Sequence, residues 1–154
     1  MILLDADKCT GCRTCELVCS VKNEGMVNPS LSRIQVNRFE TVVFEIPMYC
    51  QQCAEPPCIA ICPERAIFKD EETGIVHIDY KKCIGCKLCI TACPFGAIGY
   101  DRFCNKVFKC EQCDGDPTCV KFCETEALQY VDRTPENMQK VIESTNRLSE
   151  LQKV

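Results

Sequence analysis

The stretch CIGCKLCITACP, residues Cys83–Pro94, spaces four cysteines as Cys-x2-Cys-x2-Cys-x3-Cys and follows them with a proline. Pro94 fixes its own φ and has no N–H, so it turns the chain directly after the fourth thiol. Three more groups of four cysteines begin at Cys9, Cys50 and Cys110, with small variations in the middle spacing. Because this unit recurs along the whole chain, we expect the cysteine groups to organise the fold.

The composition also indicates that something other than an aliphatic core stabilises the chain. It has 154 residues and 17 cysteines, and these cysteines inflate the apolar fraction of 46%. Disulfides or bound metal must then replace part of a conventional core. The segment Met1–Cys9 has no basic region or long apolar run. We therefore expect no secretory signal, no disulfide framework and a reducing, anaerobic cytoplasm.

Charge and hydropathy exclude other classes of function. The net charge of −4 gives no reason to expect nucleic acid as a partner, and no apolar run approaches the length of a membrane span. The sequence has no glycine-rich phosphate loop and no Ser/His/Asp set. We expect no catalytic site in this chain.

Thiolates at this spacing bind either zinc or iron–sulfur clusters. Structural zinc sites take two CxxC pairs from separated segments, or mixtures of Cys and His. Here His77 is the one histidine, and two groups crowd three cysteines into seven residues. The spacing of residues 83–94 is that of a bacterial ferredoxin, in which the fourth cysteine ligates the neighbouring cluster. The sequence predicts four [4Fe–4S] clusters, with Cys104 as a non-ligand.

The segments that flank the groups decide how they pair. Ala66–Phe68 and Ile75–Ile78 are β-prone runs between groups two and three, and Glu72–Gly74 supplies turn residues. The same flanks recur at the chain ends: ILLDADK before group one matches VHIDYKK before group three, and EALQYV follows group four as RAIFKD follows group two. Groups two and three therefore form one unit, and groups one and four form another.

We expect an α+β fold of two bacterial-ferredoxin-like dicluster units, one inserted within the other, plus a C-terminal helix. The first unit comprises residues 1–30 and 95–131, the second residues 45–94, a hairpin linker residues 31–44 and the helix residues 132–154. Exchange of the fourth cysteine within each unit predicts four ligand sets. They are Cys9, Cys12, Cys15 and Cys123; Cys110, Cys113, Cys119 and Cys19; Cys50, Cys53, Cys58 and Cys93; and Cys83, Cys86, Cys89 and Cys62.

The linkers and the tail carry recognisable patterns. Alternating apolar residues predict a hairpin over Ser32–Ile46 with its turn at Asn37–Thr41, and a second over Gly99–Phe108 with its turn at Arg102–Asn105. A helix start at Thr134 and apolar residues at helical spacing predict an amphipathic helix over Pro135–Lys153. This helix either packs on its own chain or docks on a partner subunit.

Residues beside the ligands form the last set of candidates. Gly11 and Gly85 each precede the second cysteine of their group and would let backbone amides approach cluster sulfur. Six cations lie near ligands: Lys8, Arg13, Lys82, Lys87, Lys109 and Lys121. Each is interpreted as solvated surface, and the alternatives are that they offset cluster charge or serve docking. His77 is interpreted as structural.

The second group, YCQQCAEPPCIAICPERAIF, has Pro56-Pro57 before its third cysteine. Together with the order of the four groups, it resembles the four-cluster electron-transfer subunits of molybdenum and tungsten oxidoreductases, the dimethyl sulfoxide reductase β-subunit type, over residues 1–131. KCEQCDGDPTCVKFCETEAL and SRIQVNRFE are similar to the short members that accompany tungsten enzymes of the aldehyde ferredoxin oxidoreductase family, including ATP-independent benzoyl-CoA reductase. Ser20 and Glu124 depart from the pattern, because proline often follows the fourth cysteine.

The resemblance implies an electron-transfer subunit that serves a large catalytic subunit with a tungsten or molybdenum pterin. Ferredoxin or a further electron-transfer subunit would be a second partner. Two other interpretations remain: a freestanding polyferredoxin that serves several redox partners, and a zinc-stabilised interaction module.

Overall fold

The computed structural model describes residues 1–39 and 44–151. The strands are β1 (Ile2–Leu4), β2 (Ile34–Phe39), β3 (Phe44–Tyr49), β4 (Ile67–Lys69), β5 (Val76–Ile78), β6 (Ile98–Asp101), β7 (Lys106–Lys109) and β8 (Leu128–Tyr130). The helices are α1 (Thr14–Glu24), α2 (Pro57–Ala60), α3 (Leu88–Ala92), α4 (Thr118–Lys121) and α5 (Pro135–Leu151). Short 3-10 turns span Ala6–Lys8, Pro29–Leu31 and Gln112–Gly115. The α+β class predicted from the sequence is confirmed.

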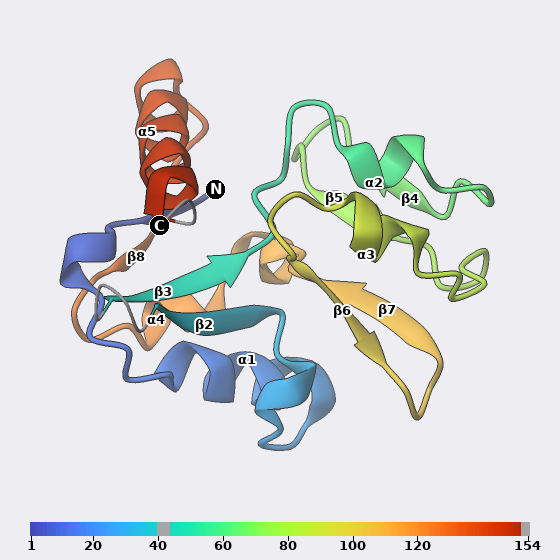
Figure 1. Cartoon of the computed structure of the whole chain (residues 1–154), viewed down its shortest axis with the longest axis horizontal. Coiled ribbons are helices and arrows are strands. Elements are labelled where there is room, and N and C mark those ends of the chain that lie inside the picture. Colours follow the sequence, from blue (N-terminus) through green and yellow to red (C-terminus); the bar gives the residue numbers. More distant parts are fainter. Residues whose placement is uncertain (40–43, 152–154) are drawn as a thin grey trace.

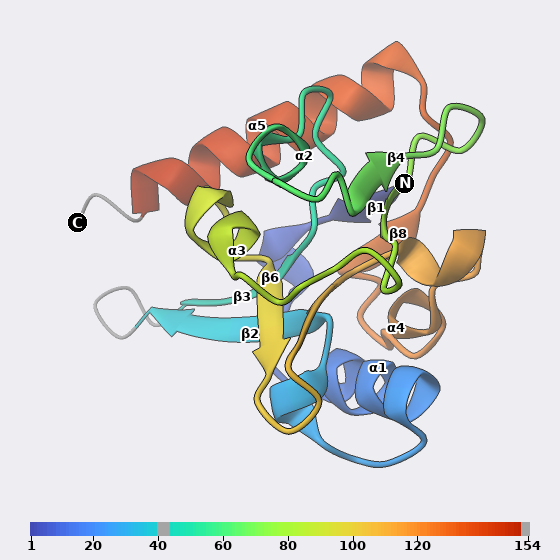
Figure 2. The ribbon, with the colours of Figure 1, turned by 90° about the vertical axis from the view of Figure 1, so that its right-hand side faces the viewer.

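The aligned flanks form equivalent strand pairs. β4 pairs antiparallel with β5 (Figure 1). β1 pairs antiparallel with β8 although they lie at opposite ends of the chain (Figure 2). The hydrogen bonds after each pair also match: Asp79 N–H donates to Ala66 O at 2.7 Å, and Asp5 N–H donates to Ala127 O at 2.8 Å. The helices follow the same scheme, because α2 lies against α3 and α1 lies against α4.

Both predicted hairpins are present. β6 and β7 pair around Arg102–Asn105, as expected. β2 and β3 also pair, but the turn predicted at Asn37–Thr41 is wrong for its first residues, since Asn37 pairs with Ile46 inside the ladder. Asn37 lies on the exposed face of an alternating strand, so its polar side chain marks that face rather than a turn. The rest of the predicted turn, residues 40–41, lies outside the described residues.

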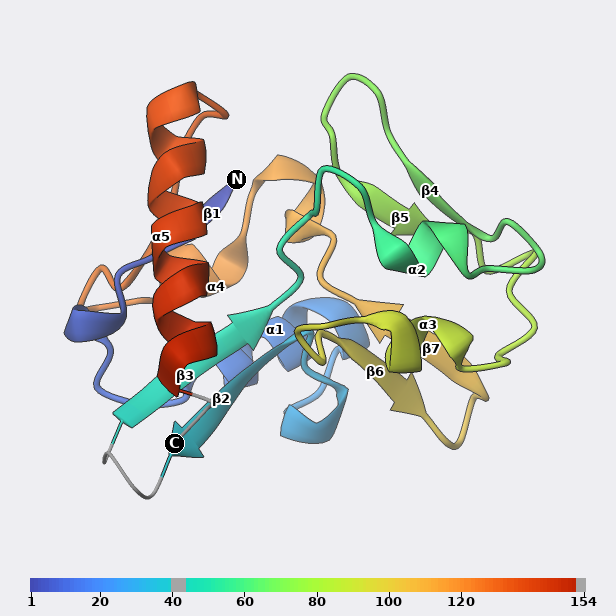
Figure 3. The same ribbon diagram turned by 45° about the horizontal axis from the view of Figure 1, so that its top comes forward.

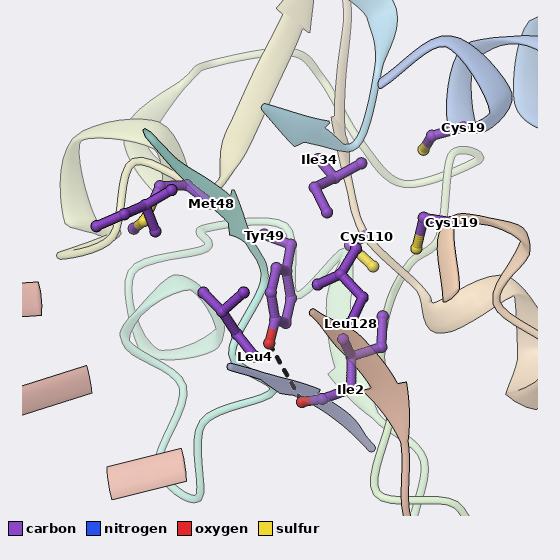
Figure 4. Close-up of a cluster of buried hydrophobic side chains, with 10 residues drawn as sticks. Ile2, Leu4, Cys19, Ile34, Met48, Tyr49, Cys110, Cys119 and Leu128 are labelled. Atoms are coloured by element: carbon purple, nitrogen blue, oxygen red, sulfur yellow. Dashed lines mark hydrogen bonds between the residues drawn. The ribbon is translucent and has the colours of Figure 1, made fainter. Parts of the chain in front are cut away.

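Two small apolar clusters form the core, and both contain cysteine side chains. In the first, Tyr49 lies among Ile2, Leu4 and Leu128, and its hydroxyl donates to Ile2 O at 3.3 Å (Figure 4). A buried carboxylate connects α1 to β2, because Glu16 Oε1 accepts the Val36 N–H at 2.6 Å. With so much of each cluster made of cysteine, stability depends on what the thiols bind.

Helix α5 begins where the sequence predicts. Thr134 caps it, accepting the Asn137 N–H on Oγ1 at 3.2 Å, and Pro135 occupies its first position. The helix lies beside β1 and extends as a single rod (Figures 2 and 3). It is described to Leu151, and the last residues of the expected helix lie outside the described part. Within the described residues, no helix has both the length and the apolarity needed to cross a bilayer.

Candidate metal centres

Each cysteine group is built on the same local structure. Its third cysteine always occupies the second position of a helix: Cys15 in α1, Cys58 in α2, Cys89 in α3 and Cys119 in α4. Peptide N–H groups are unpaired in the first turn of a helix, and there they favour negative charge. Burial raises the pKa of all four of these thiols, and at Cys15 and Cys89 a backbone N–H in the first turn opposes that increase.

A second shared feature precedes the second cysteine. The residue at this position has a left-handed backbone in all four groups, with φ of +68° at Gly11, +49° at Gln52, +70° at Gly85 and +54° at Gln112. Alternation of right- and left-handed residues directs successive N–H groups into one concavity, as in known iron–sulfur sites. The sequence indicates this role for the two glycines. It misses the two glutamines, which are found only when the groups are aligned on their second cysteine.

The thiols from different groups meet around shared cavities. One cavity is lined by Cys62, Cys83, Cys86 and Cys89, a second by Cys50, Cys53, Cys58 and Cys93, and a third by Cys19, Cys110, Cys113 and Cys119. Figure 4 shows three thiols of the last set, from α1, α4 and the end of β7. Each cavity combines three cysteines of one group with the fourth cysteine of another. Among the described residues, no three potential ligands converge closely enough to hold a single metal ion.

The remaining four cysteines are Cys9, Cys12, Cys15 and Cys123, and the charges of Cys12 and Cys9 act on Cys15. Burial raises the pKa of the Cys9 thiol, and a hydrogen bond from the Gly11 N–H lowers that pKa. The charges of Cys12 and Cys123 raise the pKa of Cys9 further. Cys9 and Cys12 from group one therefore lie close to Cys123 from group four. Cys12 is exposed, so this site is the more open side of its unit.

The turn after the fourth cysteine is shared by three groups. The residue three positions after the fourth cysteine has positive φ, and its N–H donates to the carbonyl oxygen of that cysteine. Glu126 N–H donates to Cys123 O at 3.0 Å, and Arg65 N–H donates to Cys62 O at 3.2 Å. Glu124 thus replaces proline without changing the turn. Ser20 does change it: the side chain is buried, its Oγ donates to Leu17 O at 2.8 Å, and α1 continues to Glu24.

Backbone N–H groups also reach the sulfur atoms of fourth cysteines. Ala66 N lies 3.3 Å from Cys62 Sγ, and Arg33 N lies 3.3 Å from Cys19 Sγ. Such hydrogen bonds stabilise thiolate and raise the reduction potential of a bound cluster. Four soft donors around one cavity, together with N–H groups aimed at sulfur, fit the donor set of a [4Fe–4S] cluster.

Comparison with known protein families gives the same result. Residues 41–133 match the family described as the 4Fe-4S dicluster domain, and residues 1–21 match a 4Fe-4S binding domain. The chain belongs to the 4Fe–4S dicluster family. This dicluster protein therefore binds multiple [4Fe–4S] clusters.

Relatives of the dicluster protein include subunits of redox complexes. It is 42% identical over 123 residues to the aliphatic sulfonate oxidoreductase polyferredoxin-like subunit of Pyrococcus furiosus, covering 79% of this chain and 70% of the relative. It is 34% identical over 155 residues to the electron transport protein HydN of Escherichia coli, covering 86% and 87%. A chain of the active site complex BamBC of benzoyl-coenzyme A reductase matches with a TM-score of 0.53 and 29% identity, covering 94% of this chain and 87% of that chain.

In the dicluster protein, burial raises the pKa of several unligated thiols. It raises the pKa of Cys15 and of Cys110 to about 12 and that of Cys89 to about 11. Iron binds the thiolate, so ligation replaces the protons that these buried groups otherwise retain. Cluster assembly and burial of the cysteines are therefore coupled.

The cations beside the ligands do not share one environment. Five are exposed, as expected: Lys8, Arg13, Lys82, Lys87 and Lys121. The surface interpretation is wrong for Lys109, which is only 2% exposed. His77 is structural, stacked on Phe68 and 3.6 Å from a Glu111 carboxylate oxygen. Cys104 is exposed on the turn between β6 and β7, away from the cysteine-lined cavities.

Proposed function

We propose that this chain is the electron-transfer subunit of an oxidoreductase complex, relaying electrons through four [4Fe–4S] clusters to or from a catalytic subunit. The observation that carries the proposal is the sharing of cysteines, since three cavities each combine three thiols of one group with a fourth from another. This is the ligand exchange of two-cluster ferredoxins. The family match and the relatives that are subunits of oxidoreductases support it.

The same observation supports the predicted ligand sets and the division of the chain. Cys62 and Cys93 are exchanged within a unit at residues 45–94. Cys19 and Cys123 are exchanged within a unit at residues 1–30 and 95–131. The strand pairs β4–β5 and β1–β8 support these two units, because each joins the two groups that share cysteines.

The chain's residues have three roles in this relay. A bound [4Fe–4S] cluster supplies one-electron redox chemistry. The helix N-termini at Cys15, Cys58, Cys89 and Cys119 stabilise the thiolates, and N–H donors such as Ala66 hold negative charge at sulfur. The apolar clusters pack against cysteines that line the cavities. These roles place and tune redox centres without transforming a substrate, so we assign the chain no catalytic site.

For the partner we propose a large subunit with a tungsten or molybdenum pterin, in the cytoplasm. The support is the sequence resemblance together with the benzoyl-CoA reductase structural neighbour. Ferredoxin or a further electron-transfer subunit would supply or remove electrons at the other end. The second candidate is a freestanding polyferredoxin that serves several redox partners, which is favoured by the likeness to a relative described as an electron transport protein.

Anaerobic purification from the native source tests the proposal. We expect about sixteen irons and as many acid-labile sulfides per chain, and a large subunit that remains bound through size-exclusion chromatography. Metal analysis of that subunit would identify tungsten or molybdenum. Stoichiometric zinc without sulfide would contradict the iron–sulfur assignment, and a fully loaded chain that elutes alone would favour the polyferredoxin.

A further inference from the structure

Lys109 is a buried cation at the end of β7, directly before Cys110. Its side chain is 2% exposed, and its ammonium donates to Val76 O and to Cys110 O. Among the described residues, no carboxylate lies within ion-pair distance of it. The nearest acid along the chain, Glu111, instead engages His77 and the Ile78 N–H. A buried charge is costly unless something compensates it, so the compensating charge must come from elsewhere.

Gln52 completes the same network from the other unit. Its Nε2 donates to Cys110 O at 2.9 Å, and its Oε1 accepts the Val76 N–H at 2.8 Å. Cys110 O thus accepts from both side chains, while Val76 uses its carbonyl for Lys109 and its amide for Gln52. These hydrogen bonds connect the unit that contains β5 to the unit that contains Cys110.

The network lies between two of the cysteine-lined cavities. Lys109 lines the cavity of Cys19, Cys110, Cys113 and Cys119, and Val76 lines the cavity of Cys50, Cys53, Cys58 and Cys93. The charge of Lys109 acts on both. Its ammonium donates to Val76 O and to Cys110 O, so it reaches the lining of both cavities. The ammonium is therefore placed where an electron would cross between the units.

We propose that Lys109 is the counter-charge for this crossing: it stabilises the reduced state of the two clusters on either side and so raises their reduction potentials. The inference rests on the proposed function. Reduction adds one negative charge to a cluster, and a nearby buried cation is only weakly screened by solvent. Lys109 is not a cluster ligand and would act through the two clusters, so it is a positioning residue for the relay.

The test is an electron paramagnetic resonance redox titration of the anaerobically purified complex. The variants are Lys109→Gln, which keeps a hydrogen-bond donor without the charge, Lys109→Met, which has neither, and Lys109→Arg, which keeps the charge. Lys121→Gln is the matched control, because Lys121 follows Cys119 by two residues but is exposed and paired with Asp116 at 2.5 Å. Iron and sulfide per chain are measured for every sample.

We expect two of the four redox components to move to lower potential in Lys109→Gln and Lys109→Met, at both low and high salt. The other two should stay in place, and Lys109→Arg and Lys121→Gln should resemble the wild type. Fully loaded Lys109→Gln with wild-type potentials would overturn the proposal and leave only a hydrogen-bonding role. Loss of iron from both neutral variants, with Lys109→Arg intact, would overturn it in favour of a role in assembly. Absence of clusters from the wild type would instead refute the proposed function.

Discussion

Gln52 and Gln112 occupy equivalent left-handed positions, with φ of +49° and +54°, each directly before the second cysteine of its group. In the other two groups glycine fills this position. The left-handed conformation is therefore a requirement of the loop and not a consequence of glycine. A left-handed backbone is less favourable for glutamine than for glycine, and each of these glutamines also makes a hydrogen bond through its side chain or its backbone N–H. Gln52 connects the two units, and the Gln112 N–H donates to Cys110 Sγ at 3.4 Å.

The proposed exchange of the fourth cysteines predicts a specific pattern of cluster loss. Cys93→Ala and Cys58→Ala should each remove about four irons per chain, and the double variant should remove no more, because both thiols serve one cluster. Cys93→Ala combined with Cys89→Ala should remove about eight irons. Iron and sulfide analysis of anaerobically purified protein measures this. Cys104→Ala is the control with full iron content, and additive loss in the Cys58/Cys93 pair would contradict the exchange.

Gly85 should tolerate no side chain. Its φ is +70°, and an added Cβ would lie 2.8 Å from the Asn105 carbonyl oxygen. Gly25 has a similar φ of +73° with nothing within 4 Å of such a Cβ, so Gly25→Ala isolates the backbone cost of roughly 1–2 kcal/mol. Gly85→Ala should incur that cost and the clash. We expect it to melt at lower temperature than Gly25→Ala and to release iron to a chelator faster. Equal behaviour of the two variants would show that the Asn105 contact is unimportant.

The buried Glu16 carboxylate should matter as an acceptor. Glu16→Leu leaves the Val36 N–H without a partner in a buried site and should destabilise the chain by about 1–3 kcal/mol. Glu16→Gln keeps an acceptor oxygen and should have a smaller effect. Thermal melts of both variants with full iron content provide the comparison. A Glu16→Leu protein as stable as the wild type would mean that water satisfies the Val36 amide.

Removal of the clusters should unfold most of the chain. The two apolar clusters contain many of the cysteines, and the two-stranded sheets are short, so little packing remains without ligation. We expect the chelator-treated, reduced protein to lose its cooperative melt in circular dichroism. Helix α5 should lose its order at the same time, because it lies against β1. A native-like cooperative transition of the apo protein would refute this.

Much of the fold could be read from the sequence because cysteine spacing and the aligned flanks are local signals. The strand pairs β4–β5 and β1–β8, the hairpin at Arg102–Asn105 and the start of α5 all follow from them. The environment of Lys109 could not be read, because burial depends on β5 and Gln52, which are distant in the sequence. The continuation of α1 beyond Cys19 could not be read from the sequence either, because it depends on the hydrogen-bond partners of the buried Ser20 hydroxyl.

The pairing of β1 with β8 has a consequence for how the protein is made. Residues 2–4 are synthesised more than a hundred residues before their partner strand at residues 128–130. The inserted unit can close as soon as its own two groups have emerged, whereas the outer unit must wait until nearly the whole described chain is available. During translation the thiols of group one therefore wait longer for Cys123 than the thiols of the inserted unit wait for one another, so the outer unit can be completed only after group four has emerged.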